Sequence, residues 1–187
     1  HLSNLSDDKG FFEVAETYEA LRDQGSDAEL HLAGPILSDE VRARLQALIS
    51  SSNGRVRHHG PVFGTEKRDF YRSLDLFVFP TNFDQEAAPS VIYESLAAGR
   101  PVLSTNRGCI SEMIIGERGA ILPARDGFAP AALRYLQTFD SSDVAVLARA
   151  TTIKAGMKTE AETSRAQYAA LMSLLGAKEP GHMVQEY

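Results

Sequence analysis

The chain has 187 residues, of which 43% are hydrophobic and 24% charged, and its formal net charge at pH 7 is -6. This length suffices for one well-buried domain and little more. The negative net charge excludes a general nucleic-acid-binding protein, which would need a basic surface to neutralise phosphates. The single cysteine, Cys109, excludes an internal disulfide bond and fits a reducing, cytoplasmic compartment.

The first half of the chain alternates between amphipathic helices and short strands. Apolar residues spaced at i, i+3, i+4 and i+7 from Phe11 onward predict a helix that ends at Gly25. Ser38 is a good N-cap for a second helix, and Thr65 for a third helix. The strands predicted in this half lie at residues 1–3, 29–33 and 55–59.

The second half continues the alternation. Residues 75–79 form an almost continuous apolar run, which is typical of a strand buried on both faces. Further strands are predicted at residues 101–105 and 120–122, and helices at residues 89–98, 110–115 and 130–175. Breaks in the last helix are predicted near Asp140 and Gly156.

About six strands, each followed by a helix, predict an α/β fold, namely a Rossmann-like, doubly wound parallel sheet with right-handed crossovers. In such a sheet, ligands bind beyond the carboxyl ends of the strands, at the point where the strand order reverses. With the common order 3-2-1-4-5-6, this crevice lies between strands 1 and 4. We therefore expect it to be bordered by the loops at residues 4–9 and 80–88.

The second of these loops and the helix after it carry two carboxylates. Ala88 is predicted as the N-cap of the helix and Pro89 as its first residue, so that amides of the first turn can bind phosphate or another oxygen. Glu86 precedes the helix and Glu94 lies about one and a half turns inside it, which displaces the two carboxylates along a ligand. Alone, each glutamate, like Lys9, is typical of a solvated surface. Their common position at the crevice makes all three candidate ligand-binding residues.

Two segments carry a specific motif. Residues 80–102 read PTNFDQEAAPSVIYESLAAGRPV, with two glutamates eight positions apart, and residues 3–10 read SNLSDDKG. They resemble the E-x7-E signature and the donor-phosphate segment of family 4 glycosyltransferases. Three further segments, at residues 58–62, 75–80 and 105–112, fit the order of that family. Residues 1–175 are thus similar to the C-terminal, donor-binding half of a GT-B enzyme.

The resemblance implies one nucleotide-sugar-binding domain within residues 1–187, formed by residues 1–177, with residues 178–187 as a flexible tail. It also implies an N-terminal acceptor domain outside this sequence, and the start of the chain inside a predicted strand at His1 supports that expectation. The expected partners are the nucleotide-sugar donor and that domain, but no nucleic acid. Peripheral association of the full-length enzyme with a membrane stays open. We expect the 187-residue chain alone to transfer no sugar.

The resemblance also implies roles for individual residues. Lys9 would neutralise the donor diphosphate and Glu86 would contact the transferred sugar, which makes these two the expected catalytic residues. Glu94 would accept hydrogen bonds from the two ribose hydroxyls, for which a carboxylate is well suited. The residues expected to hold sugar and phosphate oxygens or to border the base pocket are Ala87, Ala88, Pro89, Ser90, Val62 and Phe63. No metal ligand and no cofactor are expected, since no Asp-x-Asp motif occurs.

Asn4 departs from the family pattern, because arginine is usual at this position. One charge-assisted hydrogen bond contributes about 1.5–3 kcal/mol, so donor affinity would fall roughly tenfold or more unless another cation substitutes. Two other classes of function stay open. One is a nucleotide-sugar 2-epimerase-like GT-B enzyme, against which the ordered segments argue, and the other is a non-catalytic nucleotide-sugar-binding module.

Overall fold

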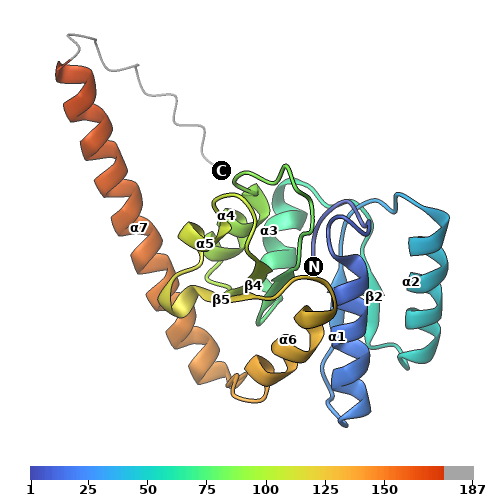
Figure 1. Cartoon of the computed structure of the whole chain (residues 1–187). Coiled ribbons are helices and arrows are strands. Elements are labelled where there is room, and N and C mark those ends of the chain that lie inside the picture. The colour runs from blue at the N-terminus through green and yellow to red at the C-terminus, as the bar shows by residue number, and fades with distance from the viewer. Residues whose placement is uncertain (175–187) are drawn as a thin grey trace.

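The computed structural model describes residues 1–174 and contains parallel strands covered by helices on both faces (Figure 1). The strands are β1 (Leu30–Leu32), β2 (Val56–His58), β3 (Phe77–Phe79), β4 (Val102–Thr105) and β5 (Gly119–Leu122). The helices are α1 (Phe11–Asp23), α2 (Asp39–Ser51), α3 (Gly64–Arg72), α4 (Ser90–Ala97), α5 (Ile110–Met113), α6 (Phe128–Leu136) and α7 (Asp143–Leu174). The tail predicted at residues 178–187 lies outside the described residues.

The strands form two parallel ladders, β1–β2 and β3–β4–β5. The segment at residues 1–3, predicted as the first strand, pairs with the end of β1 through a single parallel bridge between Leu2 and Ala33. On its other side, the His1 ring hydrogen-bonds to the carbonyl oxygen of Val78 in β3, at 2.9 Å. The α/β class with parallel strands is confirmed, and the strands on each side of this segment follow the predicted order.

Two predicted helix starts are wrong by one or two residues. Phe63, rather than Thr65, is the N-cap of α3, because the backbone is still extended there, with φ -139° and ψ 162°. Pro89, rather than Ala88, is the N-cap of α4, because its ψ of 121° keeps it out of the helix, which begins at Ser90. The amides of the first turn of α4 therefore start at Ser90.

The C-terminal helical region has one break and not two. The break near Asp140 is confirmed, since α6 ends at Leu136 and α7 begins at Asp143. The break near Gly156 is wrong, and α7 continues through this glycine. A Cβ at Gly156 would lie 3.4 Å from Nη2 of Arg118, so the absence of a side chain allows close packing within a continuous helix.

Two buried clusters hold the helices on the strands. Phe11 of α1 and Leu45 of α2 pack with Leu32 of β1 in one cluster. In the other, Ile92 of α4 packs with Phe77 of β3. Each such buried apolar side chain contributes about 1.5–3 kcal/mol to stability. This packing fixes the carboxyl ends of the strands and the starts of the loops that follow them.

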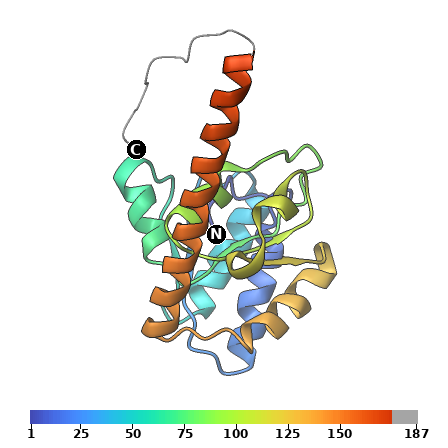
Figure 2. The ribbon, with the colours of Figure 1, turned by 90° about the vertical axis from the view of Figure 1, so that its left-hand side faces the viewer.

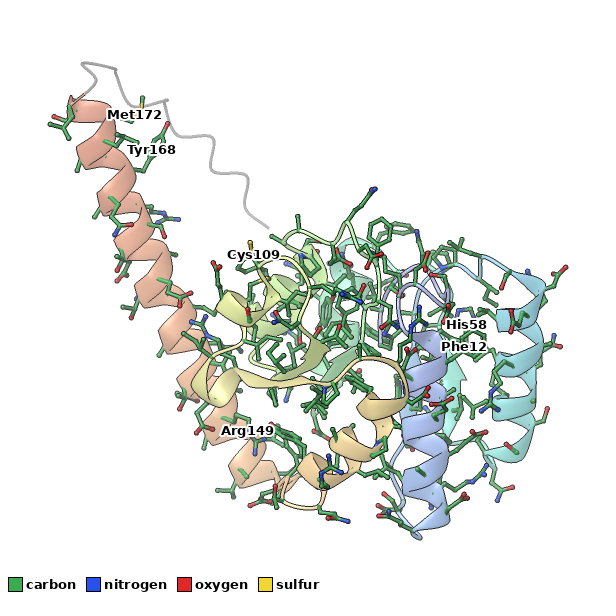
Figure 3. The ribbon with its side chains drawn as sticks, viewed as in Figure 1. Phe12, His58, Cys109, Arg149, Tyr168 and Met172 are labelled. Atoms are coloured by element: carbon green, nitrogen blue, oxygen red, sulfur yellow. The ribbon has the colours of Figure 1, made fainter. Side chains whose placement is uncertain are left out.

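Helix α7 runs along one side of the domain and extends well beyond it, as both views of the ribbon show (Figures 1 and 2). Its inner part packs on the domain through Ala150 and Ile153, which are buried. Tyr168 and Met172 lie at its outer end (Figure 3). Within residues 1–174, no helix combines the length and apolar composition that crossing a membrane requires.

Candidate functional site

A cavity of about 360 Å³ opens beside the carboxyl ends of the strands. Its walls come from the loops after residues 1–3, β1, β2 and β3, together with the start of α3 and α4. The polar and charged side chains on its surface are Ser3, Asn4, Lys9, Lys67, Glu86 and Ser90. The main apolar ones are Leu2, Val62, Phe63, Phe79, Pro89 and Val91. The cavity wall thus combines charged and apolar side chains.

The first ion pair at this cavity joins two loops. Nζ of Lys9 lies 2.7 Å from Oε2 of Glu86, and the Thr81 hydroxyl donates a hydrogen bond of 3.1 Å to the same oxygen. The same Nζ lies 4.4 Å from the centre of the Phe83 ring, so the cation also faces the π electrons of that ring. We call Lys9 and Glu86 the loop pair.

Two glycines allow the backbone contacts around the loop pair. Gly10 follows Lys9 with a φ of 78°, and a Cβ there would lie 2.2 Å from the carbonyl oxygen of Pro80. Gly108 has a φ of 49°, and a Cβ there would lie 2.1 Å from the carbonyl oxygen of Glu86. Both positions need a left-handed backbone and a missing side chain at once, which only glycine provides without strain. The position of the loop pair therefore depends on these two glycines.

The second ion pair joins two helices. Nζ of Lys67, in α3, lies 2.7 Å from each carboxylate oxygen of Glu94, in α4. The Tyr71 hydroxyl donates a hydrogen bond of 3.0 Å to Oε2 of Glu94. Burial of the phenol, followed by the negative charge of Glu94, raises the pKa of Tyr71 far above its usual range, so this hydroxyl stays a donor. We call Lys67 and Glu94 the helix pair.

The two pairs differ in how far they are removed from water. The side chains of Lys9 and Glu86 are 23% and 11% exposed, while those of Lys67 and Glu94 are 27% and 36% exposed. Each pair is neutral as a whole, so Glu86 offsets the charge of Lys9 and Glu94 offsets that of Lys67. A partly buried ammonium that is held by a carboxylate can turn to an anionic ligand, because its three N–H groups on a flexible stem are easily redirected.

The structure brings most of the predicted site residues to this cavity, but not all of them. The predicted residues that line it are Asn4, Lys9, Val62, Phe63, Glu86, Pro89 and Ser90. Ala87 and Ala88 are exposed and are not part of its wall, and the Ala87 carbonyl accepts a hydrogen bond from the Cys109 amide at 2.8 Å. Glu94 reaches the cavity only through its contact with Lys67.

Sequence reasoning missed three polar residues of this site. Lys67 and Tyr71 are four positions apart, so on a helix they share one face, and this spacing could have marked them as a pair. Thr81 comes directly after the predicted strand at residues 75–79 and Pro80, where side chains reach the carboxyl edge of the sheet. Which carboxylate each residue contacts depends on packing between elements, and no spacing in the sequence gives it.

Asn4 is exposed at the rim of the cavity and brings no charge to it. Its carbonyl oxygen accepts a hydrogen bond of 2.9 Å from the Ser3 hydroxyl. The cations among the lining residues of the described chain are Lys9 and Lys67. Residues 1–174 contain no group of three or more histidine, cysteine or acidic side chains that could hold a metal ion. The charged side chains that line the cavity are thus Lys9, Lys67 and Glu86, with Glu94 in contact with Lys67.

Comparison with protein families gives one match. The family described as "Glycosyl transferases group 1" matches residues 1–138 of the chain. A comparison with curated proteins finds no match.

Comparison with solved structures gives several matches. The chain is 26% identical to AviGT4, a glycosyltransferase involved in avilamycin A biosynthesis, over 91% of this chain and 50% of that chain, with a TM-score of 0.60. It is 20% identical to HepE of Anabaena in complex with UDP, over 92% of this chain and 47% of that chain, with a TM-score of 0.71. A mutant of TarM from S. aureus, in complex with fondaparinux, alpha-GlcNAc-glycerol and UDP, is 13% identical over 82% of this chain and 30% of its own, with a TM-score of 0.65. The chain spans about half the length of the first two proteins.

Proposed function

The chain belongs to the glycosyl transferases group 1 family, and we propose that it is the nucleotide-sugar-binding half of a retaining glycosyltransferase. Its α/β domain is a Rossmann-like half of a GT-B fold. The observation that carries the proposal is the loop pair at a cavity beside the carboxyl ends of parallel strands. The proposal includes a second half, an N-terminal acceptor domain. This is consistent with the finding that the chain spans only about half the length of AviGT4 and HepE.

In this proposal, Lys9 binds the diphosphate of the donor. Its ammonium is held by Glu86 in the absence of ligand, and an incoming diphosphate, with a charge of about -2, competes for it. Glu86 then contacts hydroxyls of the transferred sugar and stabilises positive charge that develops at the anomeric carbon. The two halves of the loop pair thus serve the two sides of the bond that breaks.

Glu94 accepts hydrogen bonds from the ribose hydroxyls, and the apolar wall of the cavity holds the base. Tyr71 and Lys67 hold the Glu94 carboxylate in one orientation, which supports its use as a fixed acceptor. Val62 and Phe63 lie on the cavity wall, and the Phe63 side chain is largely exposed, which suits a surface that a base would cover. UDP in the Anabaena neighbour suggests the first nucleotide to test.

The proposed reaction keeps the configuration of the anomeric carbon. The acceptor hydroxyl attacks on the face that the diphosphate leaves, and the leaving phosphate oxygen takes the acceptor proton. The protein then acts mainly by stabilising the charge of the departing diphosphate, and electrostatic stabilisation of this kind provides most of the rate enhancement in many enzymes. The proposal needs no metal ion or cofactor, and it assigns the reaction to a reducing, cytoplasmic compartment, as the lone Cys109 suggests.

Calorimetric titration of the chain with UDP, GDP and ADP tests the proposal. We expect at least one nucleotide to bind, and Lys9→Ala to weaken it about 10- to 100-fold, the contribution of one charge-assisted hydrogen bond. Lys158→Ala removes the same charge from an exposed position on α7 and should leave binding unchanged. If none of the three nucleotides binds, or if both lysine variants bind equally well, the assignment of this cavity to a nucleotide sugar is wrong.

The neutral Asn4 at the cavity favours one second candidate, a non-catalytic module that binds nucleotide sugars. Such a module would also bind nucleotides, so binding does not separate the two. The full-length protein with its acceptor domain does separate them, because only an enzyme releases the nucleotide from a radiolabelled donor while an acceptor gains the sugar.

A further inference from the structure

The proposed donor would bring more negative charge to the cavity than Lys9 of the loop pair can offset. A donor diphosphate carries about two negative charges, and Asn4 supplies none of the positive charge that this position usually brings. Lys9 offsets one charge at most. A second cation is therefore needed close to the same cavity if the proposed donor is to bind well.

Lys67 is the second lysine on the wall of this cavity. It comes from α3, whereas Lys9 lies in the loop before α1, and the Lys67 side chain is 27% exposed, so a ligand can reach it. Its ammonium lies 2.7 Å from both oxygens of Glu94. This contact keeps the cation at the cavity when no anion is present.

Ribose binding would loosen this contact. A carboxylate offers about four lone-pair positions on its two oxygens. Tyr71, whose side chain is buried, occupies one of them. The two ribose hydroxyls would occupy two more, which leaves about one for Lys67. An ammonium that now spans both oxygens would then keep a single hydrogen bond to Glu94 and release its other N–H groups.

We propose that Lys67 is a ligand of the donor diphosphate and supplies the positive charge that Asn4 does not. The inference rests on the proposed function, since it needs a nucleotide in this cavity. Binding of the ribose to Glu94 and binding of the phosphate to Lys67 are coupled, because the first frees the N–H groups that the second uses. Tyr71 is a positioning residue, since it holds Glu94 in place while Lys67 moves.

Titrations with a nucleotide and its nucleoside test this inference. UDP and uridine are titrated into the wild-type chain, Lys67→Ala and the control Arg68→Ala, with affinities measured by calorimetry for UDP and by NMR for uridine. Arg68 lies next to Lys67 on α3 but is exposed and outside the cavity wall. We expect Lys67→Ala to weaken UDP about 10- to 100-fold and uridine by less than about threefold, while Arg68→Ala changes neither. If GDP or ADP binds better than UDP, that nucleotide and its nucleoside replace UDP and uridine.

A rescue experiment separates phosphate binding from a structural role. Asn4→Arg places a new guanidinium on the same cavity, and we expect it to restore most of the UDP affinity that Lys67→Ala removes. A residue that acted only by shaping the Glu94 carboxylate would not be replaced in this way. Thermal unfolding of each variant checks that the fold is intact.

Each possible outcome decides for or against the inference. Selective loss of UDP affinity with rescue by Asn4→Arg supports the inference. Equal loss of UDP and uridine affinity, no loss in Lys67→Ala, or no rescue by Asn4→Arg would each overturn it. In these three cases the proposed function survives if Lys9→Ala still weakens UDP, whereas a wild-type chain that binds no nucleotide overturns both.

Discussion

The loop pair and the helix pair join the same two residue types at one cavity, but different kinds of structure hold them. Lys9 and Glu86 lie in loops that follow strands, and close backbone contacts at glycines fix those loops. Lys67 and Glu94 project from two regular helices and meet only through their side chains. The loop pair should therefore be sensitive to backbone changes, whereas the helix pair should respond only to changes of its own side chains.

The difference also concerns exchange with a ligand. The Glu86 side chain is 11% exposed and that of Glu94 is 36% exposed, so water can replace a lost partner at Glu94 far more easily than at Glu86. The helix pair is therefore better suited than the loop pair to release its lysine to an anionic ligand. Four changes can break or sharpen this comparison.

The largest effect is expected from Gly108→Ala, which acts on the backbone beneath the loop pair. A Cβ at this position would lie 2.1 Å from the Glu86 carbonyl oxygen, and the φ of 49° is strained for alanine. Steric overlap and strain together should lower the free energy of unfolding by about 3 kcal/mol. Urea denaturation at pH 7 measures this loss.

Gly116→Ala is the matched control for this change. Its φ of 55° is almost the same, but a Cβ there meets nothing within 4 Å. Only the strain of the left-handed backbone remains, about 1 kcal/mol. Equal losses in the two variants would show that close packing at Gly108 does not matter to the loops.

Thr81→Val removes the hydroxyl that donates to Glu86 of the loop pair and keeps the shape of the side chain. Thr81 is fully buried and its hydroxyl donates to Oε2 of Glu86. The buried carboxylate loses one donor, which should lower the free energy of unfolding by about 1–2 kcal/mol. Thr81→Ser, which keeps the hydroxyl, is the control for this measurement and should retain the hydrogen bond.

Tyr71→Phe makes the corresponding change at the helix pair. It removes the hydroxyl that donates to Glu94, and water can reach this more exposed carboxylate. The free energy of unfolding should fall by less than about 1 kcal/mol, the net value of an ordinary hydrogen bond. Tyr18→Phe serves as its control, because the buried Tyr18 hydroxyl has no hydrogen-bond partner within residues 1–174. A larger loss for Tyr71→Phe than for Thr81→Val would contradict the comparison of the two pairs.

The smallest effect is expected from protonation of His59, whose ring packs edge-on against Phe70 in α3, with ring centres 5.5 Å apart. Partial burial of this imidazole, followed by the charge of His31, lowers the pKa of His59 from its ordinary value of 6.5. The folded protein thus takes up this proton less readily than the unfolded chain. The contribution of neutral His59 to the free energy of unfolding is complete above pH 6.5 and is lost as the pH falls through the folded-state pKa.

Urea denaturation between pH 7.5 and pH 5 measures this dependence. His59→Gln should have a slightly flatter stability profile than the wild type in this range, because the titrating group is gone. The difference should be small, since His59 is exposed. Parallel profiles for the two proteins would show that His59 is not responsible for any loss of stability below pH 6.5.

Much of the fold followed from local patterns in the sequence. Alternating helices and strands gave the α/β class, because amphipathic spacing depends only on neighbouring residues. The boundaries were less well predicted. Thr65 looked like a helix start since its side chain is a good cap, yet α3 begins earlier at Gly64, and Gly156 looked like a break although α7 runs through it. At Gly156 the helix packs closely against Arg118, and this packing outweighed a weak local preference.

By itself, the sequence determined the α/β class, the family, and Lys9, Glu86 and Glu94 as candidate residues, because motif spacing is a property of the chain alone. Only the tertiary structure decided which lysine meets which glutamate. Lys9 and Glu86 are separated by 77 positions and Lys67 and Glu94 by 27, so both contacts depend on how loops and helices pack around the sheet. The same packing put Lys67 on the cavity where Asn4 lacks a charge, and no local pattern could have located it there.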